Sequence, residues 1–305
     1  MRATVLVLAL VVACTAAAAG AGPAAARDCP VATAPKTVAY EQIAGVPANL
    51  TSLDVWAPTP KCRVGNRRAP VVMWVHGGGY RKGDKRGAVA DKVRLFNQRR
   101  GWIFVSVNYR LTRAADPNSA RYPDHFRDVA AAVAWVRAHI SAYGGNPHRI
   151  ALLGHSAGAD IVSNVTVNPT WLRERRLPLR SIRCAGPLDT EGFDKTRVPD
   201  SDPTSLQWRL AFRNDPNFRT NTSATLLARP GPHIPSTITV FRGTPGRQAT
   251  ERAFASKLRS LGVTTALIDA TSLTHEQVNR NIGAPGDTVM TRPLLRFLTT
   301  CLQRG

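Results

Sequence analysis

Residues 150–162 read IALLGHSAGADIV, and this stretch decides the fold. Its first four residues form a short apolar run, which is typical of a strand covered on both faces. The next five, Gly154-His155-Ser156-Ala157-Gly158, match the pattern G-x-S-x-G, and a helix-compatible segment follows. A serine on a sharp strand-to-helix turn has a strained backbone, and flanking glycines avoid collisions with neighbouring Cβ atoms. The stretch therefore predicts a nucleophile at Ser156.

A second glycine-rich motif precedes this one by about 78 residues. His76-Gly77-Gly78-Gly79 follows an apolar run at 71–75, which predicts another buried strand. Backbone N–H groups that converge on one point stabilise the negative oxygen of a tetrahedral intermediate, and glycines let the substrate approach them closely. We expect the amides of Gly77, Gly78 and Ala157 to form such an oxyanion hole.

Strand and helix patterns alternate along the rest of the chain. Strands are predicted over 38–42, 50–56, 71–75, 102–107, 150–153, 181–185, 237–241 and 264–268. Helices are predicted over 88–100, 124–143, 250–261 and 293–302, with Asp124 as an N-terminal cap and residues 144–147 as a break. Residues 190–235 are polar and irregular, as expected for loops and short helices over the carboxyl edge of a sheet. This order predicts an α/β fold with a mostly parallel, twisted sheet and helices on both faces.

The composition excludes a mainly disordered or collagen-like chain, because 43% of the 305 residues are hydrophobic and only 20% are charged. The net charge is +21, from 41 Lys and Arg against 20 Asp and Glu. This charge favours an anionic partner such as the cell envelope. The basic residues are scattered, however, which also fits a solvated surface, and no basic-aromatic motif indicates nucleic-acid binding.

The N-terminal residues predict export. Residues 1–26 have a basic start, an apolar run too short to cross a bilayer and small residues before a cleavage point, as in a signal peptide. A competing interpretation is a lipoprotein signal that ends before Cys14. Residues 27–37 then form a leader, and residues 38–305 a single domain. The expected location is secreted, or lipid-anchored at the cell surface.

Four further cysteines remain in either case, and an even number in an oxidising compartment predicts disulfides. Of the three pairings that four cysteines allow, Cys29–Cys62 and Cys184–Cys301 are the predicted ones.

With both motifs in place, the chain resembles the α/β-hydrolase superfamily, in particular the esterase and lipase branch with an HGGG oxyanion loop. It is similar to bacterial feruloyl-esterase-like and formamidase-like enzymes. Further segments carry this likeness: VNYRL (107–111), the helix from Tyr122-Pro123 to Trp135, YGGNP (143–147) and GHSAGA (154–159). The short segment before the first predicted strand leaves no room for the N-terminal helical cap of some relatives, so no large cap domain is expected. The resemblance implies a catalytic triad in the chain order serine, acid, histidine.

That order restricts the general base to the histidines after Ser156, which are His233 and His275. His275 comes shortly after the last predicted strand, where the fold presents its base, and it is the predicted one. His233 lies in the irregular stretch. His76 and His155 lie within the two motifs and are expected to shape those turns.

The triad acid has several candidates. The resemblance places it after the strand at 237–241, but the chain reads RGTPGR there, with Gly246 at the expected position. Asp189, after an earlier strand, is the first replacement. Glu251 and Asp269 are alternatives, and so is the absence of an acid.

These features predict a secreted serine esterase that works through an acyl-enzyme. The alternatives are a formamide or amide hydrolase with the same residues, and a non-catalytic module that binds an anionic envelope polymer. No cofactor or metal is predicted, because no Cys-x-x-Cys or His-Glu-x-x-His spacing is present. The substrate is expected to be a small or polymer-linked ester.

Overall fold

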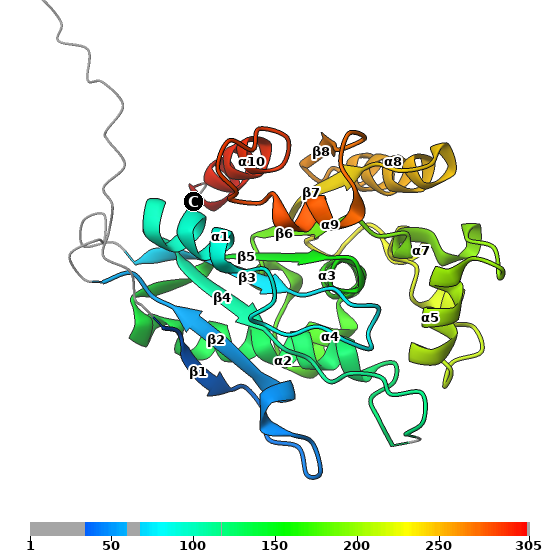
Figure 1. Cartoon of the computed structure of the whole chain (residues 1–305), viewed down its shortest axis with the longest axis horizontal. Coiled ribbons are helices and arrows are strands. Elements are labelled where there is room, and N and C mark those ends of the chain that lie inside the picture. The colour runs from blue at the N-terminus through cyan, green and yellow to red at the C-terminus, as the bar shows by residue number, and fades with distance from the viewer. Residues whose placement is uncertain (1–33, 60–67, 117, 304–305) are drawn as a thin grey trace, which may run out of the picture.

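An eight-stranded sheet in the order β1-β2-β4-β3-β5-β6-β7-β8 runs through the centre of the protein (Figure 1). The computed structural model describes residues 34–59, 68–116 and 118–303. Strands β3 to β8 pair in parallel, whereas β2 is antiparallel to both β1 and β4. The strands are β1 Lys36–Ala39, β2 Ser52–Trp56, β3 Ala69–Val75, β4 Ile103–Val107, β5 Gly145–His155, β6 Cys184–Leu188, β7 Ser236–Phe241 and β8 Thr265–Asp269. The predicted α/β fold with a mostly parallel sheet is confirmed.

Helices cover both faces of this sheet, as Figure 1 shows. The helices and short turns are η1 Ala48–Thr51, α1 Ala90–Lys92, η3 Val93–Arg99, α2 Asp124–His139, η4 Ile140–Tyr143, α3 Ala157–Val167, α4 Thr170–Glu174, η5 Leu179–Ser181, η6 Gly192–Arg197, α5 Pro203–Ala211, α6 Phe218–Asn221, α7 Ala224–Leu227, α8 Pro245–Ser260, α9 His275–Arg280 and α10 Thr291–Gln303. Side chains of α2, α3 and α4 belong to one apolar cluster, and those of η3, α9 and α10 to another. The two clusters lie against opposite faces of the strands, because successive side chains of a strand alternate between faces.

The central strands are buried along nearly their whole length, as their continuous apolar runs predict. All five residues of β4 and all but one of β3 are buried. Helix α2 presents Val129, Val133 and Val136 to the core, and none of the three is exposed. These elements position the carboxyl ends of β3, β5 and β6 side by side at one edge of the sheet, where both sequence motifs lie.

Several predicted boundaries are wrong at the ends of strands. The first strand begins at Lys36, inside the predicted leader, and ends at Ala39. Strand β6 starts at Cys184 and continues through the Gly-Pro pair because it pairs with β5 as far as Leu188. The predicted break over 144–147 ends the preceding helix, but β5 already begins at Gly145. Its pairing with β3 skips from Gly145 to residue 150, which leaves space for Pro147 in the strand.

The cap of one helix and the start of another also differ from the prediction. Asp124 is not a cap: α2 follows Pro123, and the Asp124 carboxylate accepts a hydrogen bond from the Arg121 N–H at 3.1 Å instead. Helix α8 begins five residues earlier than predicted, at Pro245. The Thr244 side chain caps it, and proline is favoured in the first helical turn.

A disulfide joins Cys184, at the start of β6, to Cys301 in α10, which confirms that predicted pair. Cys29, Cys62, Cys14 and the predicted signal peptide lie outside the described residues. Among the residues that the structure describes, no helix is long and apolar enough to cross a membrane.

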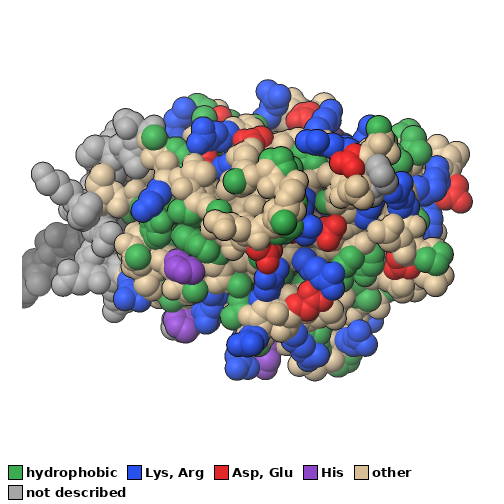
Figure 2. Space-filling model, turned by 90° about the horizontal axis from the view of Figure 1, so that it is seen from below, with side chains coloured by type: hydrophobic (Ala, Val, Ile, Leu, Met, Phe, Trp, Pro, Cys, Tyr) green, Lys and Arg blue, Asp and Glu red, His purple; other side chains and the backbone are tan. Residues whose placement is uncertain are grey.

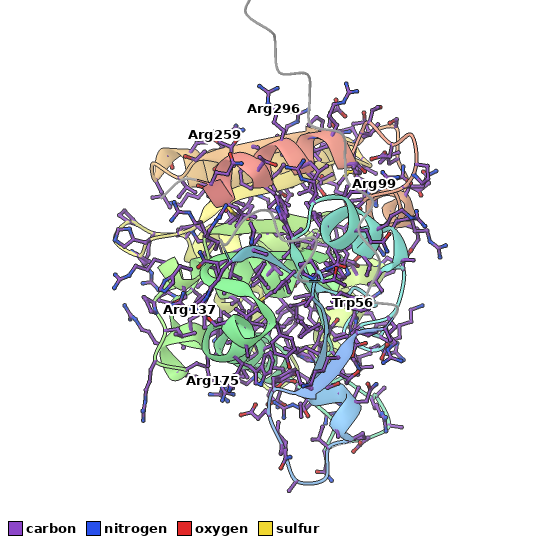
Figure 3. All side chains as sticks on the ribbon, turned by 90° about the vertical axis from the view of Figure 1, so that its left-hand side faces the viewer. Trp56, Arg99, Arg137, Arg175, Arg259 and Arg296 are labelled. Carbon is purple, nitrogen blue, oxygen red and sulfur yellow. A yellow bond between two sulfur atoms is a disulfide. The ribbon has the colours of Figure 1, made fainter. Side chains whose placement is uncertain are left out.

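The basic side chains are dispersed over the surface. Figure 2 shows Lys and Arg side chains scattered across one face with acidic side chains among them. On another side, Arg99, Arg259 and Arg296 project outward from η3, α8 and α10 (Figure 3). The face in Figure 2 therefore shows no single basic stripe of the kind that follows a nucleic-acid backbone.

Candidate active site

Ser156 lies on the sharp turn between β5 and α3, with φ 57° and ψ −123°. This is a strained backbone for a residue with a Cβ atom. The neighbouring glycines are required because the turn is too closely packed for side chains at their positions. A Cβ atom on Gly154 would lie 2.5 Å from the Gly158 carbonyl oxygen, and one on Gly158 would lie 2.3 Å from the Val75 carbonyl oxygen. The close packing of the turn therefore holds the serine side chain out at the end of β5.

His275 is the first residue of α9, in the loop that follows β8. Thr274 caps this helix in a capping box with Gln277, so the backbone of His275 is held from both sides. The His275 Nδ1–H donates a hydrogen bond of 2.6 Å to Asp189 Oδ2. Asp189 directly follows β6 and is fully buried. The structure thus brings the first of the three candidate acids to the predicted base.

Two arginines hold the same carboxylate. Arg242 Nε donates to Asp189 Oδ2 at 2.5 Å, and an Arg247 guanidinium nitrogen donates to Oδ1. Burial by itself would raise the pKa of Asp189. The hydrogen bond from His275, the charge of Arg247 and the hydrogen bond from Arg242 outweigh this effect and hold the pKa well below its usual range. Asp189 is therefore ionised at neutral pH and accepts hydrogen bonds on both oxygens.

The other two candidate acids are elsewhere. Glu251 is buried, and its carboxylate accepts the backbone N–H of Arg242 at 2.8 Å and Arg247 Nε at 3.2 Å. Asp269 is exposed and accepts hydrogen bonds from the N–H and hydroxyl of Thr271. Neither bonds to the imidazole of His275 in the described part of the chain.

His155, the residue before the serine, forms a hydrogen bond to the backbone of the predicted base. Its Nε2–H donates to the His275 carbonyl oxygen at 2.9 Å, and the two rings lie 4.4 Å apart between centroids. Burial, followed by the nearby His275, lowers the pKa of His155 to about 3. The ring is therefore neutral at physiological pH and acts as a hydrogen-bond donor that connects the serine turn to α9.

The glycine motif lies directly against the nucleophile. A Cβ atom on Gly77 would be 2.9 Å from the Ser156 Cβ and 3.0 Å from the His155 carbonyl oxygen. Gly78 has φ +115°, and a Cβ atom there would collide with the Lys82 carbonyl oxygen at 2.0 Å. Within the described residues, the N–H groups of Gly77 and Gly78 have no hydrogen-bond acceptor. Like the N–H of Ala157 at the start of α3, they are available to a ligand.

A buried ion pair anchors this loop. The Tyr80 hydroxyl, one residue past the glycines, donates to the Asp160 carboxylate in α3. Lys195 Nζ in η6 donates to the other oxygen of Asp160 at 2.8 Å, and all three side chains are almost fully buried. The arrangement fixes the glycine loop relative to the helix that begins at the serine.

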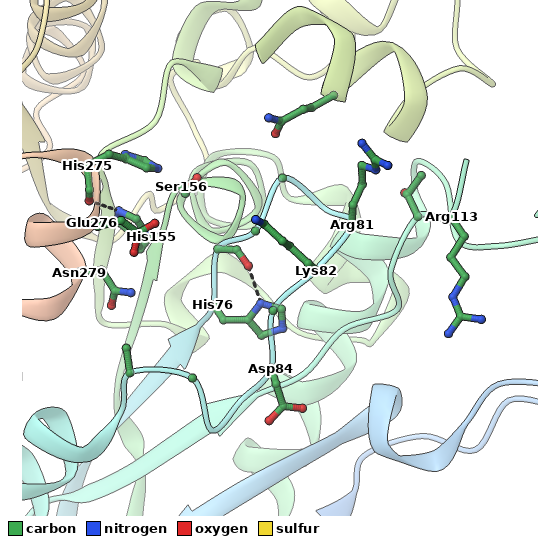
Figure 4. A pocket seen from close by; sticks show the side chains of 18 of the residues that line it. His76, Arg81, Lys82, Asp84, Arg113, His155, Ser156, His275, Glu276 and Asn279 are labelled. Atoms are coloured by element: carbon green, nitrogen blue, oxygen red, sulfur yellow. Dashed lines mark hydrogen bonds between the residues drawn. The ribbon is translucent and has the colours of Figure 1, made fainter. Parts of the chain in front are cut away.

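Ser156 and His275 line two cavities. The larger, of about 1030 Å³, is lined by the glycine loop and by α9, and the smaller has about 310 Å³. Figure 4 shows the His275 ring turned toward Ser156 at the edge of the larger cavity. The Ser156 hydroxyl makes no hydrogen bond to the described residues. Bonds of this type are often not formed until a substrate is bound.

His155, Asp189 and His275 also form a group with the residue types of a metal site, since their ligand atoms lie within 4.8 Å of one another. Hydrogen bonds already engage the group, however. His155 Nε2 donates to a carbonyl, and the two guanidiniums on Asp189 repel a cation. The donor set fits an acid–base pair better than a metal centre.

Sequence reasoning missed the arginine pair and the buried ion pair. Arg242 and Arg247 lie on either side of Gly246, in the segment where an acid was expected. The presence of basic residues in place of that acid was the sequence feature that could have indicated the arginine pair. No local pattern connects Asp160 with Lys195, because 35 residues separate them.

Comparisons with known proteins agree with this geometry. A model of the carboxylesterase family matches residues 28–174. The chain is 40% identical over 117 residues to a probable carboxylic ester hydrolase, LipM, from Mycobacterium tuberculosis, which covers 38% of this chain and 25% of that protein. It is 35% identical over 126 residues to bile salt-activated lipase from Mus musculus, covering 38% of this chain and 21% of the lipase. The match thus spans a quarter or less of these relatives' length.

Solved structures extend the likeness to most of the chain. Esterase B from Lactobacillus rhamnosis, in a structure with a tributyrin phosphonate, has a TM-score of 0.68 at 18% identity and covers 90% of this chain and 89% of its own. A bacterial heroin esterase has a TM-score of 0.67 at 19% identity, with 89% and 84% covered. A hyperthermophilic esterase from Pyrobaculum calidifontis has a TM-score of 0.62 at 21% identity, with 82% and 80% covered.

Proposed function

We propose that this chain, which has the α/β-hydrolase fold and whose residues 28–174 match the carboxylesterase family, is a serine carboxylic-ester hydrolase. The observation that carries the proposal is the hydrogen bond from His275 to the buried Asp189, beside a serine on a strained turn. The unengaged amides of the glycine loop support it, because they supply the donors that acyl transfer needs.

The proposed reaction has two halves. Ser156 Oγ attacks the ester carbonyl carbon while His275 Nε2 takes its proton. The C–O bond to the alcohol then breaks, and the imidazolium returns the proton to the leaving oxygen. Water attacks the acyl-enzyme in the same way and releases the carboxylic acid. Asp189 holds the Nδ1 proton and stabilises the imidazolium.

The oxyanion of each tetrahedral intermediate would be bound by the N–H groups of Gly77, Gly78 and Ala157. Each such donor contributes about 3–4 kcal/mol to the barrier in enzymes of this kind. The rigid attachment of the loop through Tyr80 and Asp160 would keep these donors in position without reorganisation during the reaction.

The proposal includes export. A signal peptide over 1–26, with a lipid anchor at Cys14 as the alternative, agrees with the disulfide between Cys184 and Cys301. After export, the net charge of +21 would favour association with an anionic cell envelope. Release of the protein from envelope preparations by high salt tests this point, and retention in high salt would contradict it.

Hydrolysis of short-chain aryl esters tests the enzymatic proposal. We expect turnover in the wild type, loss of turnover in Ser156→Ala, and labelling of Ser156 by an organophosphonate that the variant does not take up. An unreactive serine with no turnover would favour the non-catalytic binding module. Faster hydrolysis of matched amides than of esters would favour the amidase alternative.

A further inference from the structure

The larger cavity at Ser156 has an excess of positive charge on one side. Arg81, Lys82 and Arg113 line it, and all three side chains are exposed. Their three charged groups form no ion pair and no hydrogen bond with any described residue. In Figure 4 they lie on the side of the cavity opposite His275, and the Lys82 ammonium is directed toward Ser156.

The acidic residues of the same cavity are already engaged. The Asp84 carboxylate accepts hydrogen bonds from the Asn108 side chain at 2.9 Å and from the backbone N–H of Arg86 at 2.9 Å. Glu276 lies 3.9 Å from Arg280 in α9. Both acids keep their negative charges, but Arg81, Lys82, Arg113 and Arg280 line the same cavity, so four cations against two acids leave its lining with a net charge of +2.

The smaller cavity has no free cation among the described residues that line it. Its arginines, Arg242 and Arg247, both donate to Asp189, so their charges are used within the protein. Its other two carboxylates are also paired, Asp160 with Lys195 and Glu191 with Arg247. An anionic group on a bound ester would therefore be favoured in the larger cavity.

The two volumes favour one placement of the ester in the two cavities. About 310 Å³ accommodates a short acyl chain, whereas about 1030 Å³ accommodates a bulky leaving alcohol. We propose that the enzyme prefers esters of short acids whose alcohol carries a carboxylate or another oxyanion, bound by Lys82, Arg81 and Arg113. This inference rests on the proposed esterase function and specifies its substrate class.

A pair of acetate esters tests the proposal. 4-Acetoxybenzoate carries a carboxylate, and 4-acetoxybenzamide has nearly the same shape without charge. The kcat/KM of each is divided by its rate of hydroxide-catalysed hydrolysis, which removes the difference in leaving-group reactivity. We expect the corrected ratio to favour the anion by about tenfold at low salt and to fall as ionic strength rises.

Single-charge variants separate local binding from attraction by the whole protein. Lys82→Gln and Arg113→Gln should each lower the ratio several-fold. Arg296→Gln is the matched control, because it removes the same charge from an exposed position on α10 (Figure 3) and should leave the ratio unchanged. In Lys82→Gln the backbone and the first side-chain carbons are retained, so the close packing of residue 82 against Gly78 is preserved.

Each outcome has one meaning. A ratio near one in the wild type, with the amide-bearing ester still hydrolysed, overturns this inference and leaves the esterase function intact. An equal loss in Arg296→Gln also overturns it, because the preference then comes from the net charge. Hydrolysis of neither ester overturns the proposed function, and this inference with it.

Discussion

Asp189→Asn is the substitution that most directly tests the acid–base pair. Asp189 has φ +64°, a left-handed conformation that asparagine adopts about as readily as aspartate. The change therefore removes one negative charge with almost no change in shape or backbone strain. Alanine would add backbone strain to the loss of the carboxylate, so asparagine is the better probe.

The surroundings of Asp189 leave the new amide two orientations. His275 Nδ1 and Arg242 Nε both donate to Oδ2, and Arg247 donates to Oδ1, so the amide nitrogen must replace one of these acceptors and face a donor. With the nitrogen at Oδ1, His275 keeps its hydrogen bond, but the negative charge that stabilises the imidazolium is lost. With the nitrogen at Oδ2, two donors cannot bond, so the imidazole places its proton on Nε2 and Nδ1 accepts. In that tautomer Nε2 cannot take the serine proton. The corresponding change in serine proteases lowers kcat by about 10⁴, or about 5 kcal/mol in the barrier.

The assay is kcat for a short-chain aryl ester, with thermal unfolding as the check on folding. Glu251→Gln and Asp269→Asn are the controls, because each also replaces a carboxyl side chain by its amide; burial raises the pKa of Glu251 to about 8, so only Asp269→Asn also matches the loss of charge. Asp269 is exposed, so its variant should keep wild-type stability and activity. Glu251→Gln should keep activity within about tenfold, although burial makes some loss of stability expected. A folded Asp189→Asn enzyme within tenfold of the wild type would refute the reasoning, as would a larger loss in either control.

Three further predictions follow from particular contacts. Gly77→Ala should lower kcat by about 10²–10³, because the new Cβ atom would lie 2.9 Å from the Ser156 Cβ atom. Gly246→Ala is the control: a Cβ atom there meets no atom within 4 Å, so its kinetics should be near wild type. In the wild type, the unfolded histidine binds a proton that the folded ring, with its pKa of about 3, does not bind, so the free energy of unfolding should fall by about 1.4 kcal/mol per pH unit from about pH 6.5 to 3. His155→Gln should remove this part of the pH dependence, measured by denaturant titration. Replacing Cys184 and Cys301 by alanine should cost about 2–4 kcal/mol in the free energy of unfolding, since the bond closes a loop of 117 residues, and an unchanged unfolding midpoint would contradict this.

Local patterns predicted most of the fold but not all element ends. The apolar runs of β3 and β4 reflect burial on both faces, so those strands were found within two residues. Boundaries failed where pairing with a neighbour extends an element beyond its own propensity, as in β5 and β6. The start of α8 could have been read from Thr244-Pro245, a common cap and first-turn pair.

The amino-acid sequence alone determined the two glycine motifs, the parallel sheet and the position of Ser156, because these depend on residues consecutive in the chain. It did not decide which of three candidate acids pairs with His275. The loops that follow parallel strands converge on one edge of the sheet, so a carboxylate in any of them could lie against this histidine. Only the tertiary structure decided that Asp189 lies against it, 86 residues earlier in the chain. The physical reason is charge. Arg242 and Arg247 arrive from a third loop and keep that buried carboxylate ionised, and this arrangement has no signature in any short segment.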